Sequence, residues 1–275
     1  MAALHVCLIG HPVAHSLSPM IHAHWFKQYG VRGAYDLHDI RTENLAEGVG
    51  ALVEGGYAGF NVTVPHKQAL LPLCAALDEE ARVIGAVNTV VVQPGGALRG
   101  LNTDAFGLIE NLRVERPGFD FKESPALVLG AGGAARAVIH ALKKAGVGEI
   151  TIANRTGDKA GRLAEEFGVE TVLWEDREKA LARSGLLVNT TSLGMRGKEA
   201  LILDLALLPR KTVVYDIVYR PLVTNLLAAA KARGNPVVTG IGMLLHQARL
   251  AFAAWTGIMP DITPELARKI GEAAQ

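Results

Sequence analysis

The sequence predicts an α/β fold with two domains. Its 275 residues are 49 % hydrophobic and 20 % charged, which is enough to bury a large core in one large or two modest domains. Apolar strand-like segments alternate with segments of helical period along most of the chain. A glycine-rich turn at residues 130–133 stands between one such strand and one such helix, which is typical of a second α/β unit.

The first zone alternates strands and helices and ends near residue 102. Strands are predicted at residues 6–9, 35–40, 59–64, 85–92 and 97–101. Helices are predicted at residues 19–29 and 45–54, and a short one after Pro65, because proline is favourable at the first position of a helix. The last two strands flank a Pro-Gly-Gly turn and therefore indicate a hairpin. This alternation favours a mostly parallel sheet.

The second zone begins near residue 104, with a helix at residues 106–112 and a polar linker at residues 113–124. Its strands are predicted at residues 126–129, 150–153, 185–188, 213–217 and 236–238, and a helix at residues 135–145. From residue 240 onward only helices remain, at residues 243–256 and after Pro264, so we expect this segment to return to the first domain. The predicted domains are residues 1–103 with 240–275, and residues 104–239, with the substrate in a cleft between them.

The glycine run follows the strand at residues 126–129 directly and opens the next helix. This is the context that a dinucleotide site requires, because no side chain blocks the pyrophosphate and the helix N-terminus supplies amide donors. Where NAD enzymes usually carry a carboxylate for the ribose hydroxyls, this chain has Asn154, Arg155, Thr156 and then Lys159. A guanidinium binds a 2′-phosphate through charge-assisted hydrogen bonds, whereas a carboxylate repels it. The residues favour a Rossmann-type domain that binds NADP, although a glycine run alone is also compatible with a plain tight turn.

Composition excludes several classes of function. A formal net charge of +1 gives no electrostatic case for nucleic acid or for an acidic membrane surface. The two cysteines, Cys7 and Cys74, have no metal or redox spacing and indicate buried thiols in a reducing compartment. The first apolar run lacks the basic segment of a secretion signal, and polar residues interrupt the apolar stretch at residues 237–259. We therefore expect a cytoplasmic protein, and no metal site, because prolines break the helical spacing of the histidines at residues 11–24.

Hydride transfer to or from an alcohol carbon needs a group that moves the hydroxyl proton. Lys67, in Asn61-Val-Thr-Val-Pro-His-Lys67, follows a predicted strand end, and Asp104 ends the last strand of the first zone. A carboxylate in that position can orient the amine. From the residues alone, Lys67 can equally be a surface lysine, and Asp104 a helix N-cap before Ala105.

Nine motifs stand in order along the chain: Gly10-His-Pro-Val-Ala-His-Ser16-Leu-Ser18-Pro19, Asn61-Val-Thr63-Val-Pro65-His-Lys67, Gly85-Ala-Val-Asn88-Thr89, Asn102-Thr-Asp104-Ala-Phe-Gly107, Gly130-Ala131-Gly132-Gly133-Ala134, Asn154-Arg155-Thr156, Asn189-Thr-Thr-Ser192-Leu-Gly194-Met195, Tyr215-Asp-Ile-Val-Tyr219 and Gly240-Ile-Gly-Met243-Leu-Leu-His-Gln247. With these motifs the chain resembles the shikimate dehydrogenase family along nearly its whole length. The resemblance implies reversible, NADPH-dependent reduction of 3-dehydroshikimate to shikimate.

The resemblance also implies roles for individual residues. Lys67 and Asp104 would be the catalytic pair, with Lys67 exchanging the proton at the oxygen that becomes the C3 hydroxyl. The substrate would be bound by Ser16, Ser18, Thr63, Lys67, Asn88, Asp104, Tyr219 and Gln247. The cofactor would be bound by Gly130, Ala131, Gly132, Gly133, Ala134, Asn154, Arg155, Thr156, Lys159, Thr191, Ser192, Met195, Ile217, Gly240 and Met243. Simpler interpretations are a helix N-cap for Ser18, a packed strand-edge tyrosine for Tyr219, and plain core for the methionines.

Two alternative functions remain open at this point. One is a sibling activity on the same scaffold, a quinate/shikimate or aminoshikimate dehydrogenase. The other is a regulatory protein that binds NADP(H) without turnover, which the presence of both Lys67 and Asp104 disfavours. The expected partner is a small-molecule substrate, and the expected assembly is a monomer or a homodimer.

Overall fold

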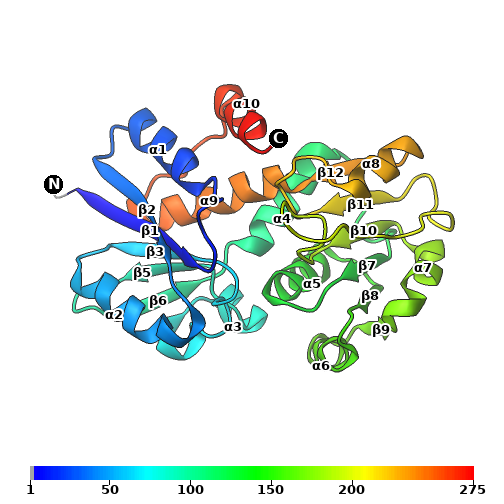
Figure 1. Ribbon diagram of the computed structural model, residues 1–275, viewed down its shortest axis with the longest axis horizontal. Helices are drawn as coiled ribbons and strands as arrows, with labels where there is room; N and C mark the ends of the chain where they lie inside the picture. The colour runs from blue at the N-terminus through cyan, green and yellow to red at the C-terminus, as the bar shows by residue number, and fades with distance from the viewer. Residues whose placement is uncertain (1–2) are drawn as a thin grey trace. The chain divides into compact units, whose positions relative to one another are not determined.

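A computed structural model describes residues 3–275, and the chain divides into two compact units (Figure 1). Unit 1 runs to Asp104 and includes Leu245–Ala273, whereas unit 2 comprises Ala105–Leu244 and Ala274–Gln275. The division thus falls after residues 104 and 244, where the sequence placed it after residues 103 and 239. Both units are α/β, as predicted.

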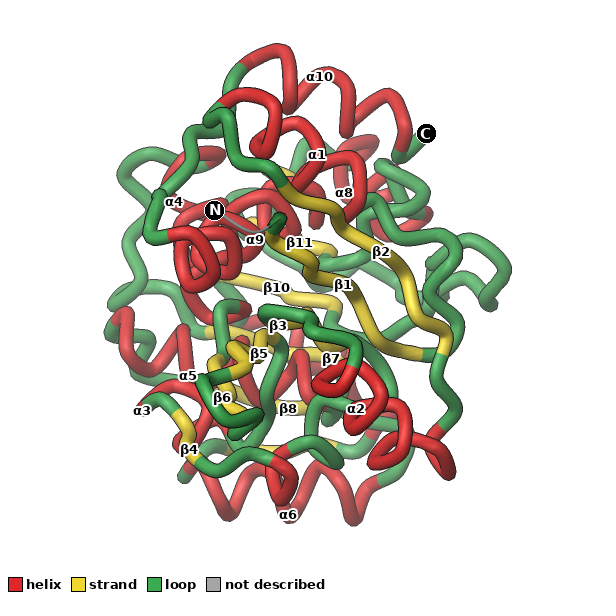
Figure 2. Tube along the Cα trace, turned by 90° about the vertical axis from the view of Figure 1, so that its left-hand side faces the viewer, coloured by secondary structure: helices red, strands yellow, loops and turns green. Residues whose placement is uncertain are grey.

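Unit 1 contains a six-stranded mixed sheet in the order β2-β1-β3-β5-β6-β4 (Figure 2). The strands are β1 (Leu4–Gly10), β2 (Gly33–Asp39), β3 (Gly59–Val62), β4 (Ala76–Leu77), β5 (Thr89–Val92) and β6 (Leu98–Leu101). β1 pairs in parallel with β2 and β3, and β4 with β6, whereas β5 is antiparallel to β3 and to β6. The predicted hairpin is therefore present, and the parallel strands β1, β2 and β3 end at one edge of the sheet.

Helices cover both faces of this sheet. They are α1 (Ser18–Gln28), α2 (Leu45–Glu54), α3 (Glu79–Ile84), α9 (Gly240–Thr256) and α10 (Pro264–Ala273), with single 3₁₀ turns at Thr42–Asn44 and Leu71–Leu73. α2 packs Leu45, Val49 and Leu52 against a core that includes Ile9 and Phe60. α1 and α9 meet in an aromatic cluster around the buried His22, and α10 packs on α1 (Figure 1). The C-terminal helices from Leu245 onward thus return to unit 1, as predicted.

Two local predictions in unit 1 are wrong. No helix follows Pro65: residues 65–70 form turns, because the Lys67 carbonyl accepts the Val87 N–H at 2.7 Å and is not available to a helix. The predicted strand at residues 85–92 begins only at Thr89, because Gly85 adopts a left-handed conformation (φ 67°) that ends α3. The sequence did contain the signals of α3, with Asp78 as the N-cap that accepts the Ala81 N–H at 2.6 Å.

Unit 2 contains a six-stranded, fully parallel sheet in the order β12-β11-β10-β7-β8-β9. The strands are β7 (Ala126–Leu129), β8 (Ile150–Ala153), β9 (Glu170–Val172), β10 (Leu186–Asn189), β11 (Val213–Asp216) and β12 (Val237–Thr239). This is the doubly wound order of dinucleotide-binding folds, and its direction reverses between β7 and β10. Ligands of such sheets bind at that switch point, beyond the carboxyl ends of the strands.

The helices of unit 2 lie on both faces of its sheet (Figure 1). They are α4 (Asp104–Glu115), α5 (Gly133–Ala145), α6 (Gly157–Phe167), α7 (Arg177–Ala180) and α8 (Asn225–Ala232), with 3₁₀ turns at Trp174–Asp176 and Leu181–Arg183. α5 and α6 pack together on one face, and α7 and α8 share a core with Leu127, Leu129 and Val214 on the other. Within residues 3–275, no helix combines the length and the apolar character needed to span a membrane.

Candidate functional site

Lys67 and Asp104 form a contact near the carboxyl edge of the unit 1 sheet. The Lys67 Nζ lies 2.6 Å from Asp104 Oδ2, and the two side chains are 17 % and 6 % exposed. Lys67 stands in the turns after β3, where its carbonyl is held by Val87. The other carboxylate oxygen of Asp104 accepts from Asn88 Nδ2 at 2.8 Å. Asp104 is therefore not a helix N-cap, because both its oxygens serve side chains, and Lys67 is not a free surface lysine.

Asn88 links this pair to a larger buried network. Its Nδ2 also donates to Thr103 Oγ1 (2.9 Å), and its Oδ1 accepts from the Thr103 N–H (2.9 Å) and from Thr89 Oγ1 (3.0 Å). Gln247, on α9, joins through its Oε1, which lies 3.2 Å from Thr103 Oγ1 and 3.4 Å from Asn88 Nδ2. The structure thus brings together Lys67, Asp104, Asn88 and Gln247, which are scattered over the sequence.

Two supporting residues, Asn102 and Asn61, stand in the motifs of the sequence but were assigned no role from it. Asn102 accepts the Asp104 N–H at 3.0 Å and donates to the Ala86 carbonyl at 2.8 Å. Asn61 donates to Thr89 Oγ1 at 3.0 Å and accepts from the Tyr35 hydroxyl at 2.7 Å. Apart from these motifs, their sequence signal is a polar residue at a strand end, where an apolar one is usual. These two side chains support the network through hydrogen bonds to its members, and most of their hydrogen-bonding capacity is used within the protein.

Thr63 and the two predicted serines lie on segments that meet beyond β1 and β3. A Cβ on Gly10 would lie 2.4 Å from Thr63 Cγ2, so only glycine fits there, and the His11 N–H donates to the Val64 carbonyl at 3.0 Å. Ser16 Oγ accepts the Ser18 N–H at 3.2 Å. The interpretation of Ser18 as an N-cap is wrong, because Ser18 is already the first residue of α1 and Leu17 precedes it as the cap.

Two histidines of this region, His11 and His22, make contacts within the protein. His11 pairs with Asp39, and the hydrogen bond from His11 lowers the pKa of the Asp39 carboxyl. His22 is fully buried and stacks on Tyr35 with ring centroids 4.3 Å apart. Among residues 3–275, no group of three or more His, Cys, Asp or Glu side chains is arranged to hold a metal ion.

In unit 2 the glycine run lies at the carboxyl end of β7. Gly130 has φ 114°, and a Cβ there would lie 2.5 Å from Thr190 Oγ1, so the turn requires glycine. A Cβ on Gly132 would meet nothing within 4 Å. No side chain caps α5, so the amides of its first turn, at Gly133, Ala134 and Ala135, lack helical partners. An open space beside uncapped amides, at the end of a 13-residue helix, fits a diphosphate group.

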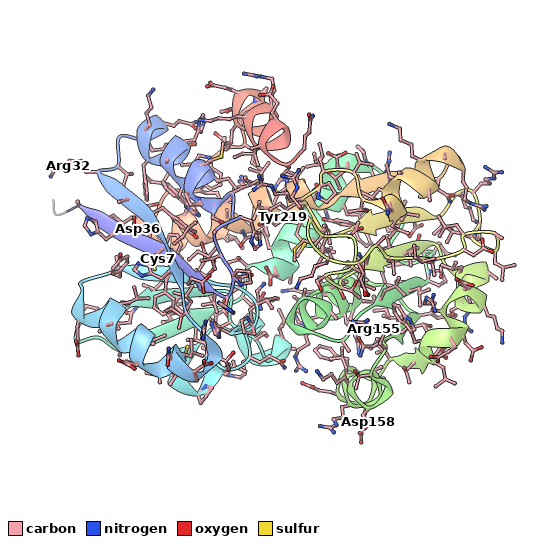
Figure 3. The ribbon with its side chains drawn as sticks, in the orientation of Figure 1. Cys7, Arg32, Asp36, Arg155, Asp158 and Tyr219 are labelled. Carbon is pink, nitrogen blue, oxygen red and sulfur yellow. The ribbon has the colours of Figure 1, made fainter. Side chains whose placement is uncertain are left out.

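The residues predicted at the 2′-phosphate follow β8. Asn154 donates to the Thr156 carbonyl at 2.9 Å and so shapes the turn that leads into α6. Arg155 and Lys159 are exposed, and within the described part of the chain neither side chain makes a hydrogen bond or an ion pair. Figure 3 places Arg155 near the end of β8 and Asp158 at the outer edge of α6. The two basic side chains are therefore available to an anionic ligand.

The remaining cofactor candidates lie where β10, β11 and β12 end. Thr191 and Ser192 follow β10, and the Met195 N–H donates to the Ser192 carbonyl at 3.2 Å. A Cβ on Gly240 would lie 2.3 Å from the Ile217 carbonyl oxygen, so the segments after β11 and β12 touch. Met243 is buried on the early turns of α9, as core would be. Tyr219 is partly exposed and belongs to unit 2, whereas the other seven predicted substrate residues belong to unit 1.

Comparisons with known families and proteins match this chain over both units. The sequence matches the family descriptions "Shikimate dehydrogenase substrate binding domain" over residues 8–90, "Shikimate / quinate 5-dehydrogenase" over residues 113–210 and "Shikimate 5'-dehydrogenase C-terminal domain" over residues 240–264. It is 52 % identical to a shikimate dehydrogenase (NADP(+)) of Paramagnetospirillum magneticum, over 94 % of this chain and 95 % of that protein. A second shikimate dehydrogenase (NADP(+)), of Nitrobacter winogradskyi, is 50 % identical over 94 % of this chain and 93 % of its own length.

Solved structures agree with this match. The crystal structure of shikimate 5-dehydrogenase from Thermus thermophilus, in complex with NADP(H) and shikimate, superposes with a TM-score of 0.86. That protein is 43 % identical, and the match covers 98 % of each chain. Quinate dehydrogenase from Corynebacterium glutamicum in complex with NAD superposes with a TM-score of 0.88 at 31 % identity, covering 98 % of each chain. The chain belongs to the shikimate dehydrogenase family.

Proposed function

We propose that this protein catalyses the reversible, NADP-dependent reduction of 3-dehydroshikimate to shikimate. The observation that carries the proposal is the Lys67–Asp104 contact of 2.6 Å within the network of Asn88 and Gln247. Relatives about half identical over nearly the whole chain are named shikimate dehydrogenase (NADP(+)). They confirm the predictions of an oxidoreductase and of NADP as its cofactor.

Unit 2 is the proposed NADP-binding domain. The open space at Gly132 and the uncapped amides of α5 would receive the diphosphate, and Asn154, Arg155, Thr156 and Lys159 would surround the 2′-phosphate. The segments after β10, β11 and β12 would hold the nicotinamide, with Thr191, Ser192, Met195, Ile217, Gly240 and Met243. When bound, NADPH supplies the hydride that reduces the carbonyl carbon.

Unit 1 is the proposed substrate domain. In the reductive direction the Lys67 ammonium gives a proton to the carbonyl oxygen at C3, and in the oxidative direction the Lys67 amine takes that proton back. Asp104 holds the amine in place through its Oδ2, while Asn88 fixes the other carboxylate oxygen. Asn88, Gln247 and Thr63 combine hydroxyl and amide groups that can both donate and accept, which suits the hydroxyls of a polyol ring.

The substrate carboxylate is assigned to Ser16, Ser18 and Tyr219. Hydroxyl groups donate hydrogen bonds to a carboxylate without adding charge. The proposed location is the cytoplasm and the proposed assembly a monomer or homodimer. Both cysteines are free thiols, which supports a reducing compartment.

The experiment measures NADPH formation by absorbance with purified protein, shikimate and NADP, beside matched reactions with quinate and with NAD. The proposal predicts turnover with shikimate and NADP at the highest kcat/KM. A second candidate, a quinate/shikimate dehydrogenase, is favoured by the similarity to the NAD complex of quinate dehydrogenase. Comparable kcat/KM with quinate or NAD would establish that alternative. NADP binding without oxidation of either acid would contradict both and favour a protein that binds NADP(H) without turnover.

A further inference from the structure

A buried carboxylate at the end of β11 has no role in the proposed mechanism. Asp216 is fully buried, and burial raises the pKa of its carboxyl to about 6, against the opposing effect of its hydrogen bonds. Its Oδ1 accepts from Asn189 Nδ2 (2.9 Å) and from the Val218 N–H (3.0 Å). Its Oδ2 accepts from Thr224 Oγ1 (2.7 Å), which also caps α8. A single side chain thus joins three segments at the carboxyl edge of the unit 2 sheet.

Asp216 determines which way the Asn189 amide points. An ionised carboxylate only accepts hydrogen bonds, so the amide must turn its NH₂ toward Asp216. The same NH₂ donates to the Leu193 carbonyl at 3.3 Å. The amide oxygen then faces the opposite side, where it accepts from the Thr191 N–H (3.0 Å) and from Thr191 Oγ1 (2.7 Å). The partners on both sides of the amide agree with this orientation.

The orientation of Asn189 in turn fixes the role of the Thr191 hydroxyl. Its proton is committed to Asn189, and one of its two lone pairs accepts the Leu193 N–H at 3.1 Å. One lone pair remains. The Thr191 hydroxyl can therefore accept one more hydrogen bond but cannot donate one.

Thr191 lies beside the proposed cofactor site. It follows β10 by two residues, on one side of the switch point between β7 and β10. A Cβ on Gly130 would lie 3.2 Å from Thr191 Cγ2, so the threonine packs directly against the glycine turn. Thr191 is partly exposed. The free lone pair is thus carried by a residue at the proposed cofactor site.

We propose that Asp216 is a positioning residue that acts through Asn189 to make Thr191 a hydrogen-bond acceptor for the carboxamide NH₂ of the nicotinamide ring. This inference rests on the proposed function, because it assigns the nicotinamide to the segment after β10. The carboxamide is the group on the ring that can donate to such an acceptor. The relay gives the site a preference for a cofactor that carries an amide at this position over one that carries a ketone.

The first test compares NADP with its 3-acetylpyridine analogue, which keeps the carbonyl and lacks the NH₂. Dissociation constants are measured for the native protein, Thr191→Val and Thr191→Ser. We expect the native protein and Thr191→Ser to bind NADP about 3- to 10-fold more tightly than the analogue, the range of one neutral hydrogen bond. Thr191→Val should lose that preference. An unchanged preference in Thr191→Val would overturn the inference.

The second test examines Asp216. In Asp216→Asn the charge is lost and the new amide can present either NH₂ or oxygen to Asn189. Only the Val218 N–H still favours the oxygen on that side, so the orientation of Asn189 is imposed less strictly than by a carboxylate. We expect the preference for NADP over the analogue to fall severalfold, with no change in affinity for adenosine 2′,5′-bisphosphate, which lacks the nicotinamide. The matched control is Thr224→Val, which removes the hydrogen bond to Asp216 Oδ2 and the α8 cap but leaves the relay through Oδ1 intact. It should lower the melting temperature and keep the preference.

A role of Asp216 in stability alone would weaken binding of NADP and of the bisphosphate equally, and that result would overturn the inference. Should Asp216→Asn fail to fold, the comparison of Thr191→Val with Thr191→Ser decides the acceptor role. NADPH formation by the native protein with shikimate is recorded in the same preparations. Native activity together with an unchanged cofactor preference in the Thr191→Val and Asp216→Asn variants would refute the relay and leave the proposed function standing.

Discussion

Gly130 and Gly132 are glycine for different structural reasons: Gly130 for its backbone conformation and Gly132 for the open space beside it. Alanine substitutions distinguish the two reasons. In Gly132→Ala the new methyl group enters open space, since nothing lies within 4 Å of its position. The backbone there (φ −94°, ψ −172°) is extended and accessible to alanine, although alanine is a poorer N-cap than glycine. We expect the free energy of unfolding to change by less than about 1 kcal/mol.

NADP binding by Gly132→Ala should nevertheless fall sharply. The methyl group would occupy the open space that is proposed to receive the diphosphate beside the uncapped amides of α5. Loss of one or two hydrogen bonds to a charged group costs about 1.5–3 kcal/mol each, so we expect at least tenfold weaker binding. Titration calorimetry measures the affinity, and urea unfolding without ligand measures the stability.

Gly130→Ala is the matched comparison. It should mainly lower the stability of the fold, whereas Gly132→Ala should mainly weaken NADP binding. Its Cβ would lie 2.5 Å from Thr190 Oγ1, at a backbone φ of 114° that costs a side chain about 1–3 kcal/mol. We expect a loss of stability of at least that size. A Gly132→Ala protein that binds NADP as tightly as the native protein would refute the assignment of the diphosphate to this turn.

Two further predictions follow from single residues. Arg155→Ala should raise the KM for NADP by about 10- to 100-fold and leave the KM for NAD unchanged, because only NADP carries the 2′-phosphate; an equal effect on both cofactors in steady-state assays would disprove the assignment. Burial lowers the pKa of His22 to about 3 from 6.5, and both its ring nitrogens lack hydrogen-bond partners. Between these pH values the unfolded chain binds a proton that the folded chain does not, so His22 reduces stability by about 1.4 kcal/mol per pH unit as the pH falls. Asp216 changes stability in the opposite direction between pH 3.8 and about 6, because its raised pKa lets the folded chain bind a proton that the unfolded chain does not. The effect of His22 is therefore isolated as the difference in the free energy of unfolding between the native protein and His22→Phe, measured by urea unfolding. A difference that does not vary with pH would refute the buried, neutral state of His22.

Local patterns predicted most of this fold. β8 and α2 have the predicted bounds, because their apolar residues repeat at the period of one element and the flanking residues end it. The prediction of a helix after Pro65 was wrong because the Lys67 carbonyl accepts a long-range hydrogen bond from the Val87 N–H. β9 was missed because it is a three-residue edge strand with little burial.

The candidate site shows the same limit. Gly132 and Arg155 could be predicted as cofactor residues because strand–turn–helix patterns place them. Asn102, Asn61 and Asp216 were not found, since a polar residue at a strand end looks the same in sequence whether it faces solvent or supports a network. Their partners lie on other strands, and only the folded chain brings them together.

Lys67 is proposed to move the proton of the reacting hydroxyl group, and the Lys67→Ala variant tests this role. The measurement is kcat for NADPH formation at saturating shikimate and NADP, with the dissociation constant for NADP determined on the same sample. We expect kcat to fall by about 10²- to 10⁴-fold, because the group that transfers the proton is lost. NADP affinity should stay at the native value, because Lys67 belongs to unit 1 and the cofactor candidates belong to unit 2. A Lys67→Ala protein that turns over at the native rate would exclude Lys67 as the proton donor and acceptor.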